Sequence, residues 1–426
     1  MPCRTLALPL ETVTLNPHIS GGLYRPEFEK DSCGFGLIAQ MDDRASHWVV
    51  ETAIGSLACL THRGAIAPDG KTGDGCGLLL RMPDAFLRRV AKDAGWVLAQ
   101  HYAVGMLFLH TDAALAERAR AVLKQELEAE GFAVHGFRPV PVDASACGAE
   151  ALKTRPRVEQ IFANPPAGLE PAVVERRLYV ARRRTEKQLE RDDRMFYVAS
   201  LSCRILSYKG LVMPANLPLF YTDLTDPDFA SSVCVFHQRF STNTWPEWRL
   251  AQPFRHLAHN GEINTIKGNR YWSLARAYTL KSSAIANMDD VRPLVSMTGS
   301  DSLSLDNMLD ALIAGGANFF RAVRLLIPPA WQNVPTMDTD LRAFYEYNSM
   351  HMEPWDGPAG IVLTDGQYAG CVMDRNGLRP ARWLMTRDRH FIVASETGVH
   401  PFEPRDVLAR GRLKPGEMIA VDLAAG

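Results

Sequence analysis

The sequence predicts a large globular protein that combines helices with hairpin-connected strands. Of its 426 residues, 46% are hydrophobic and 22% are charged, a balance that allows the core of one large domain or two ordinary ones. Helical and strand-like patterns alternate over residues 84–193. The final third is rich in hairpins, such as the apolar runs 361–363 and 368–373 on either side of an Asp365-Gly366 turn.

Charge balance and cysteine pattern exclude several classes of protein. The 47 basic and 48 acidic residues give a formal net charge of -1, which provides no electrostatic footprint for nucleic acid or an anionic membrane. The eight cysteines form no C-x-x-C pair, so the sequence indicates neither a zinc site nor a disulfide framework. No apolar run is long enough for a signal-peptide core or a membrane span. We therefore expect a cytoplasmic protein that acts on a small neutral or zwitterionic ligand.

The stretch 31–40 (DSCGFGLIAQ) places a cysteine at the head of a short apolar run. Gly34 and Gly36 beside Cys33 let other backbone approach closely, which suggests a nucleophile at the start of a strand. The alternative is a small buried cysteine in a glycine-bearing strand, and an isolated cysteine favours that alternative. Residues 1–32 are interrupted by proline and glycine and show no periodicity, which indicates a leader outside the core.

A helix is predicted directly after this first strand. Ser46 can cap it, and apolar residues recur at helical spacing until Gly64, so Arg63 is expected at a helix end. The glycine-rich stretch 69–77 precedes an apolar strand at 78–80. It lacks the spacing of a Walker phosphate loop and has too few acidic positions for a calcium loop, so we interpret it as a tight turn.

Two further helices are predicted near residues 112–131 and 171–191. The second carries several arginines, but the glutamates between them favour a solvated helix face over a nucleic-acid site. The elements expected after it are strands at 198–208 and 232–240, helices at 265–283 and 301–314, and strands at 382–385 and 391–394.

The segment 258–264 (AHNGEIN) holds the second informative group. An asparagine side-chain amide beside a glycine N–H can direct two donors at one oxygen, as a tetrahedral acyl intermediate requires. Taken alone, Asn260-Gly261 would be a turn, since N-G is a common turn dipeptide. Cys33, Arg63, Arg239 and Asp301 occur elsewhere in the chain in this order, and together they favour the catalytic interpretation over a turn.

Several long blocks of sequence resemble one known family, the class II glutamine amidotransferase domain of glutamate synthase large subunits. The blocks are CGFGLIA (33–39), HRGA (62–65), DGKTGDGCG (69–77), HQRFSTNT (237–244), AHNGEINT (258–265), GSDS (299–302), EPWDGPAG (353–360), DRNGLRPAR (374–382) and ASE (394–396). The shorter blocks, HxRxST and HNGE, occur in class II amidotransferases broadly. DGKTGDG and DRNGLRPAR are the blocks that point to glutamate synthase.

The resemblance implies an α+β fold, the four-layer αββα sandwich of N-terminal-nucleophile hydrolases, with two antiparallel sheets between helix layers. It also implies that residues 1–32 are a propeptide and that residues 33–426 form the amidotransferase domain. Removing the propeptide would make Cys33 the N-terminus, and a free α-amine with a pKa of about 7.7 to 8.0 can serve as its base. No separate catalytic histidine is then needed, so His62, His237, His256 and His259 are expected to be structural.

In the implied chemistry, Cys33 attacks the side-chain carbonyl of L-glutamine, and Asn260 and Gly261 hold the oxyanion. Arg239 and Asp301 form a complementary pair of charges for the α-carboxylate and the α-ammonium of glutamine. Two other residues are expected at the substrate site: Arg63 would order the pocket wall, and Thr242 would add a hydroxyl contact.

The resemblance also implies a partner. Glutamate synthases continue into central and FMN and iron-sulfur domains, where ammonia meets 2-oxoglutarate, whereas this sequence stops at Gly426. We expect no cofactor in this chain, and an excised domain or a free-standing glutaminase that donates ammonia. Two alternatives stay open: a catalytically silent docking or regulatory domain that keeps its leader, and an amidohydrolase for another amide. Arg239 and Asp301 disfavour the latter, because they suit a zwitterion.

Overall fold

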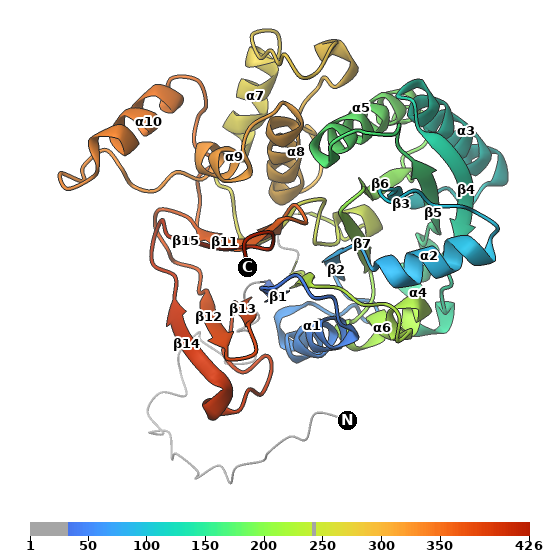
Figure 1. The fold of residues 1–426 in the computed structure, drawn as a ribbon, viewed down its shortest axis with the longest axis horizontal. Coiled ribbons are helices and arrows are strands. Elements are labelled where there is room, and N and C mark those ends of the chain that lie inside the picture. The colour runs from blue at the N-terminus through green and yellow to red at the C-terminus, as the bar shows by residue number, and fades with distance from the viewer. Residues whose placement is uncertain (1–32, 241–243) are drawn as a thin grey trace.

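The computed structural model describes residues 33–240 and 244–426 (Figure 1). Three antiparallel sheets organise this part of the chain. In spatial order, the seven-stranded sheet consists of β14 (Val407–Arg412), β12 (Arg382–Thr386), β13 (His390–Ala394), β1 (Gly34–Gln40), β8 (Val233–Gln238), β2 (Cys76–Arg81) and β7 (Ile205–Gly210). The second sheet consists of β15 (Met418–Asp422), β11 (Tyr368–Met373), β10 (Ala359–Thr364) and β9 (Leu257–Gly261). The third consists of β4 (Ala133–Pro139), β5 (Arg157–Asn164), β3 (Ala103–Leu109) and β6 (Tyr197–Ser202).

Helices cover the outer faces of these sheets (Figure 1). The longer ones are α1 (His47–Cys59), α2 (Asp84–Asp93), α3 (Ala113–Ala129), α5 (Pro171–Leu189), α7 (Ile266–Arg276), α8 (Asp301–Ala314), α9 (Phe319–Leu326) and α10 (Thr339–Ser349), and the short ones are α4 (Ala149–Lys153) and α6 (Leu217–Phe220). None of the helices in the described residues combines the length and the apolar character that a bilayer crossing requires.

The seven-stranded and second sheets pack face to face, as period-two alternation along their strands shows. In β1, Phe35 and Leu37 belong to a buried cluster shared with the second sheet, while Ile38 points into a cluster with α1. In β10, Val362 joins the cluster between the sheets, and Ile361 joins one with α8 and α9. Alternate residues of a strand face opposite sides of a sheet, so these clusters define a helix–sheet–sheet–helix order. The predicted αββα sandwich is confirmed.

The third sheet is an addition that the sequence did not predict. It packs against α3 and α5 through a separate core that includes Leu107, Leu123 and Leu178. Its strand β6 is joined to β7 of the seven-stranded sheet by a short turn at Cys203 and Arg204. The predicted single strand 198–208 is therefore two strands in two different sheets.

The prediction of a solvated face for α5 is wrong. Arg182 on this helix is only 3% exposed, and its guanidinium forms ion pairs with Glu186 and with Asp310 of α8, at 2.8 and 2.6 Å. Glu186 also accepts a hydrogen bond from Arg255, which is buried as well. Arg182 and Glu186 of α5 thus form a buried ionic cluster with Asp310 and Arg255, in which each charge has a partner.

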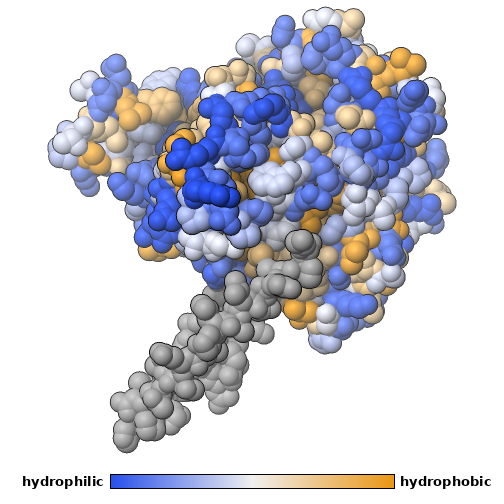
Figure 2. All heavy atoms as spheres, turned by 60° about the horizontal axis from the view of Figure 1, so that its bottom comes forward, coloured by the Kyte–Doolittle hydropathy of each residue, from blue (hydrophilic) through white to orange (hydrophobic). Residues whose placement is uncertain are grey.

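Other local predictions are confirmed. Ser46 caps α1, and its hydroxyl accepts a hydrogen bond from the Val49 N–H at 3.4 Å. The stretch 69–77 is a turn in which the Asp69 carboxylate accepts hydrogen bonds from the backbone of Lys71 and Thr72. On the face drawn in Figure 2, hydrophilic residues predominate and hydrophobic ones form small separate groups.

Candidate active site

Cys33 directly precedes β1, a central strand of the seven-stranded sheet, with β13 on one side and β8 on the other. Its sulfur accepts a hydrogen bond from the Phe240 N–H at 3.2 Å and lies 3.5 Å from the Phe240 carbonyl oxygen. Within β1, Gly36 packs closely against Phe236 of β8, since a Cβ at Gly36 would lie 2.1 Å from the Phe236 ring. The backbone of Phe240, just after β8, therefore holds the thiol at the start of β1.

A cavity of about 440 Å³ opens beside this thiol. Its walls come from segments far apart in the sequence, which include the starts of β1 and α8, the ends of β8 and β9, the chain at Gln252 and the helix α7. Cys33, Arg239, Gly261 and Asp301 all line it. The fold thus brings four of the predicted site residues to one cavity.

Asn260 and Gly261 end β9, where they pair with Gly360 and Ala359 of β10. They lie in a strand and form no turn, so the turn interpretation that the sequence disfavoured is wrong. Gly261 has φ of +128°, and a Cβ at this position would lie 1.8 Å from the Pro358 carbonyl oxygen, so only glycine fits. Asn260 is 1% exposed, and its Oδ1 has no hydrogen-bond partner among the described residues. Asn260 does not itself line the cavity but is the direct neighbour of Gly261, which does.

Asp301 is the first residue of α8, whose N-cap is Ser300. One carboxylate oxygen, Oδ2, accepts a hydrogen bond from the Ile263 N–H at 2.8 Å, and Oδ1 accepts one from the Ser302 N–H at 2.7 Å. A carboxylate oxygen can accept more than one bond, so both retain acceptor capacity. Asp301 therefore presents a fixed negative charge to the cavity and ties α8 to the chain beyond Gly261.

Arg239 is 4% exposed and brings a positive charge to the cavity, which Arg270 also lines. Its Nη1 donates to the Asp74 carbonyl oxygen at 3.3 Å, and its Nη2 donates to Thr244 Oγ1 at 2.5 Å. These two bonds use only part of the five N–H donors of a guanidinium. Arg239 is thus oriented by its surroundings and can still bind an anion in the cavity.

The surroundings of Cys33 affect its ionisation in opposite directions. Burial raises the pKa of the Cys33 thiol, whereas the Phe240 N–H and the Arg239 charge lower it, and Asp301 raises it further. The net pKa is above the ordinary value of the thiol. At neutral pH the group is therefore a thiol, and a base must take its proton before it can act as a nucleophile.

A family model described as class-II glutamine amidotransferases matches residues 33–426. The chain belongs to the class II glutamine amidotransferases. The match covers nearly the whole sequence and begins at Cys33, one of the residues that line the cavity. This amidotransferase therefore carries its cavity within the region that defines the family.

Curated relatives of this amidotransferase include two glutamate synthases. It is 41% identical over 407 residues to the glutamate synthase [NADPH] large chain of Bacillus subtilis (strain 168), which covers 95% of this chain and 27% of the relative. It is 40% identical to ferredoxin-dependent glutamate synthase 2 of Synechocystis sp., over 93% of this chain and 26% of that protein. The chain thus spans about a quarter of the length of these relatives.

Among solved structures, the similar chains include the glutamine phosphoribosylpyrophosphate amidotransferase from B. subtilis complexed with ADP and GMP. The TM-score is 0.30 at 15% sequence identity, with 75% of this chain and 47% of that chain covered.

Of the residues predicted at the substrate site, Arg63 is not among the described residues that line the cavity. Arg63 lies in a 3-10 turn (Thr61–Arg63) beyond the end of α1 and forms an ion pair with Glu396, which His62 also contacts at 2.9 Å. Thr242 lies outside the described residues, as does the whole stretch 1–32.

Two of the remaining histidines, His237 and His256, have structural contacts. His237 is fully buried, its Nε2 lies 3.0 Å from the His259 carbonyl oxygen, and burial lowers its pKa to about 3. His256 forms an ion pair with Asp310 at 3.2 Å, and the Asp310 carboxylate helps to raise its pKa to about 9 against the effect of burial. His259 lines the cavity, but within the described residues the hydrogen bonds of Cys33 Sγ go to the Phe240 backbone. The geometry assigns none of them to the thiol as a base.

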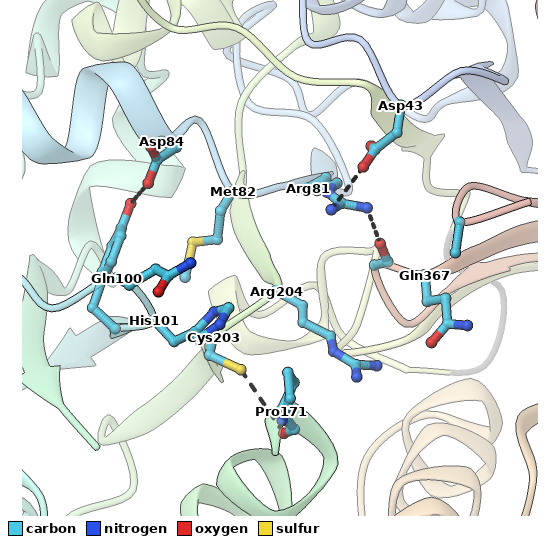
Figure 3. Close-up of a pocket in the computed structure, with 13 residues that line it drawn as sticks. Asp43, Arg81, Met82, Asp84, Gln100, His101, Pro171, Cys203, Arg204 and Gln367 are labelled. Atoms are coloured by element: carbon cyan, nitrogen blue, oxygen red, sulfur yellow. Dashed lines mark hydrogen bonds and ion pairs between the residues drawn. The ribbon is translucent and has the colours of Figure 1, made fainter. Parts of the chain in front are cut away.

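A second cysteine also lines a cavity, which is shown in Figure 3. This space of about 380 Å³ holds Cys203, beside charged groups that pair with one another or with backbone. Arg81 lies 2.8 Å from Asp43 and donates to the Gly366 carbonyl oxygen at 2.7 Å. None of the predicted catalytic or substrate-binding residues lines it.

The sequence missed some residues of the Cys33 cavity. Gln252 and Arg270 line it but belong to no recognisable catalytic pattern. Thr244 accepts a hydrogen bond from Arg239. It is the last residue of the HQRFSTNT block, and this position in the block could have identified it from the sequence.

Proposed function

We propose that this protein hydrolyses L-glutamine to L-glutamate and ammonia, with Cys33 as the nucleophile. The observation that carries this proposal is the single cavity in which a thiol, a glycine at the end of β9 and two opposite fixed charges meet. L-glutamine offers a matching carbonyl carbon, carbonyl oxygen, α-carboxylate and α-ammonium. The family to which the chain belongs supports the same substrate.

In the proposed reaction, removal of residues 1–32 leaves Cys33 with a free α-amine that takes the thiol proton. The sulfur then forms a bond to the amide carbon of glutamine, and the carbonyl oxygen becomes an oxyanion. The Gly261 N–H and the Asn260 side-chain amide would donate to that oxygen. The C–N bond breaks as the α-ammonium returns its proton to the leaving nitrogen, and ammonia departs. Water then hydrolyses the thioester and releases glutamate.

Specificity for glutamine would come from the two charges. Arg239 would bind the α-carboxylate through its remaining N–H groups, and Asp301 would bind the α-ammonium through the free acceptor capacity of its oxygens. A substrate lacking either group would leave one buried charge without a counterpart, which is costly. Arg63 as part of the pocket wall and Thr242 as a hydroxyl contact remain secondary parts of the proposal.

The ammonia would pass to a glutamate synthase polypeptide that aminates 2-oxoglutarate. The names of the relatives support this partner, and the share of their length that this chain matches leaves room for the acceptor site elsewhere. The chemistry proposed for this chain uses the groups of the protein and water, so FMN and an iron-sulfur cluster would belong to the partner. Cys33, Cys76, Cys147, Cys203, Cys234 and Cys371 are free thiols, which supports a reducing compartment such as the cytoplasm.

Intact mass and ammonia release on the same purified sample test this function. We expect a chain that begins at Cys33 and releases ammonia from L-glutamine but not from L-asparagine. A chain that keeps residues 1–32 and still turns over glutamine would contradict the α-amine as base. A processed chain without any glutaminase activity would favour the silent docking or regulatory domain instead.

A further inference from the structure

Gln252 forms a buried hydrogen-bonded bridge beside the active-site cavity. It is 4% exposed and lies between the short helical turn at Trp248–Leu250 and β9. Its Oε1 accepts a hydrogen bond from the His259 N–H at 2.8 Å, and its Nε2 donates to Ser302 Oγ at 3.3 Å. A backbone N–H can only donate, so the first bond fixes which way the amide points.

The two ends of this bridge are next to the groups that the proposed reaction uses. His259 directly precedes Asn260 and Gly261, and Ser302 directly follows Asp301. Asp301 in turn accepts a hydrogen bond from the Ile263 N–H on the far side of Gly261. The oxyanion segment is therefore held against the start of α8 on both sides, by Gln252 before it and by Asp301 after it.

The backbone that carries Gln252 is itself held in place by a buried lysine. Lys209 of β7 is fully buried, and its Nζ donates to the carbonyl oxygens of Ala251 at 2.8 Å and Arg249 at 3.0 Å. On the other side, a Cβ at Gly77 would lie 2.9 Å from the Gln252 carbonyl oxygen, so β2 packs closely here. Burial lowers the pKa of Lys209 far below its ordinary value. The anchoring bonds need only its N–H groups, which both protonation states have.

We propose that Gln252 is a positioning residue, which sets the oxyanion donors Asn260 and Gly261 at a fixed distance from the Asp301 carboxylate that binds the α-ammonium. This inference rests on the proposed glutaminase function. A substrate held by Asp301 reaches the oxyanion donors only if that distance matches the glutamine side chain, and small misplacements of reacting groups can cost about 100-fold in rate. Gln252 acts through its neighbours and needs no contact with the substrate.

The test is Gln252→Met, which keeps the length of the side chain and removes both hydrogen bonds. We expect kcat for glutamine hydrolysis to fall roughly 10- to 100-fold with a smaller change in KM, because the donors matter most when the oxygen is charged. The rate at which iodoacetamide alkylates Cys33 should stay within about twofold of wild type, since that reaction uses the Phe240 contact rather than the oxyanion donors.

Gln160→Met is the matched control. Gln160 is also a fully buried bridging amide: it accepts from Arg138 Nη1 at 2.8 Å and donates to the Tyr208 hydroxyl at 2.9 Å. It lies on β5 of the third sheet and does not line the cavity. Its replacement should lower the unfolding temperature in the same way as Gln252→Met and leave kcat within about twofold of wild type.

Two results would overturn the positioning role. One is a Gln252→Met variant with wild-type kcat. The other is a Gln252→Met variant in which the rate of Cys33 alkylation falls in parallel with kcat, which would indicate general disruption. If Gln252→Met does not fold, Ser302→Ala keeps the Oε1 bond and removes the Nε2 bond together with the 3.2 Å contact between Ser302 Oγ and Ser300 Oγ, and it should lower kcat about three- to tenfold. Unchanged kcat there contradicts the role. Wild type measured alongside separates the two claims, because an inactive wild type contradicts the glutaminase function itself.

Discussion

Two cavities of similar size each hold a cysteine, but their surroundings differ. The cavity at Cys33 has about 440 Å³ and the one at Cys203 about 380 Å³ (Figure 3). Cys33 receives a backbone N–H and lies beside a buried arginine, both of which lower its pKa against the effect of burial. Cys203 lies beside Glu175, which together with burial raises its thiol pKa well above the ordinary value.

The two cavities also differ in how their charged side chains are paired. At Cys203, Arg81 pairs with Asp43 and the Tyr102 hydroxyl donates to Asp84, so the charges compensate each other. At Cys33, Arg239 and Asp301 are each held by neutral backbone or hydroxyl groups and keep their charge available to a ligand. A thiol in a cavity is therefore not enough to indicate a nucleophile. Its hydrogen-bond donors and the unsatisfied charges around it distinguish the two cases.

The largest difference should appear when each cysteine is removed. Cys33→Ala should abolish glutamine hydrolysis, because no other thiol lines the cavity within the described residues. Cys203→Ala is the matched control and should keep kcat within about twofold of wild type. Steady-state ammonia release measures both. Activity that survives in Cys33→Ala and is lost in Cys203→Ala would reverse the assignment.

Loss of the oxyanion donor should have the next largest effect. Asn260→Ala should lower kcat by roughly 100-fold or more with a smaller change in KM, and Asn260→Asp should be worse because it places an acceptor where a donor is required. Asn164→Ala is the control and should keep wild-type kcat. Asn164 ends β5 of the third sheet, and its side chain forms hydrogen bonds with the backbone of Val97 and Ala99. Near-normal turnover in either Asn260 variant would refute the donor role.

Loss of one charge at the Cys33 cavity should act mainly on binding. Arg239→Ala and Asp301→Asn should each lower kcat/KM by roughly 100-fold, chiefly through KM, because the charges bind glutamine in the ground and transition states alike. Asp301→Asn removes the charge and keeps one of the two side-chain oxygens, so only one acceptor remains for the Ile263 and Ser302 N–H groups.

Substrate analogues make the role of Asp301 more specific. Wild type should discriminate strongly against glutamine with an acetylated α-amine, and in Asp301→Asn that discrimination should largely vanish. If it persists, Asp301 is not the ammonium site. Asp306 of α8 would be a poor alternative candidate for binding the α-ammonium, since it is fully buried and its Oδ1 accepts a hydrogen bond from the His256 N–H at 2.8 Å.

The smallest expected effect concerns reactivity without any substrate. Because the Phe240 N–H and Arg239 lower the pKa of Cys33 while Glu175 raises that of Cys203, iodoacetamide should alkylate Cys33 roughly tenfold faster at pH 8. Both thiols are shifted upward by burial, so both rates should rise with pH above 8, where the thiolate fraction grows. Peptide mass spectrometry after timed alkylation measures the ratio. Equal rates would contradict the role given to the neighbouring donors.

Local signals predicted those elements whose ends are set by nearby residues. The helix predicted at 301–314 has the observed bounds of α8, because Ser300 provides the N-cap and the apolar spacing continues to Ala314. The hairpin around Asp365-Gly366 is confirmed, since its turn residues are adjacent in sequence. The helix predicted at 265–283 ends at Arg276, where the chain turns without a glycine or proline signal.

Features that depend on distant partners were not predicted. Arg182 looked solvated because Asp310, its partner, is 128 residues away. The bridge formed by Gln252 joins residues 7 and 50 positions further along the chain and follows no motif. The meeting of Cys33, Arg239, Gly261 and Asp301 was expected from the resemblance to a family rather than from spacing, and the fold places them in one cavity.

The most direct test of the central claim is peptide mass spectrometry of active protein after inactivation by a glutamine-like chloroketone. We predict one adduct, on the sulfur of a Cys33 that is also the N-terminal residue with a free α-amine, and its formation should parallel the loss of ammonia release. An adduct on Cys203 or another residue, or an active chain in which Cys33 is still joined to Ser32, would contradict the claim.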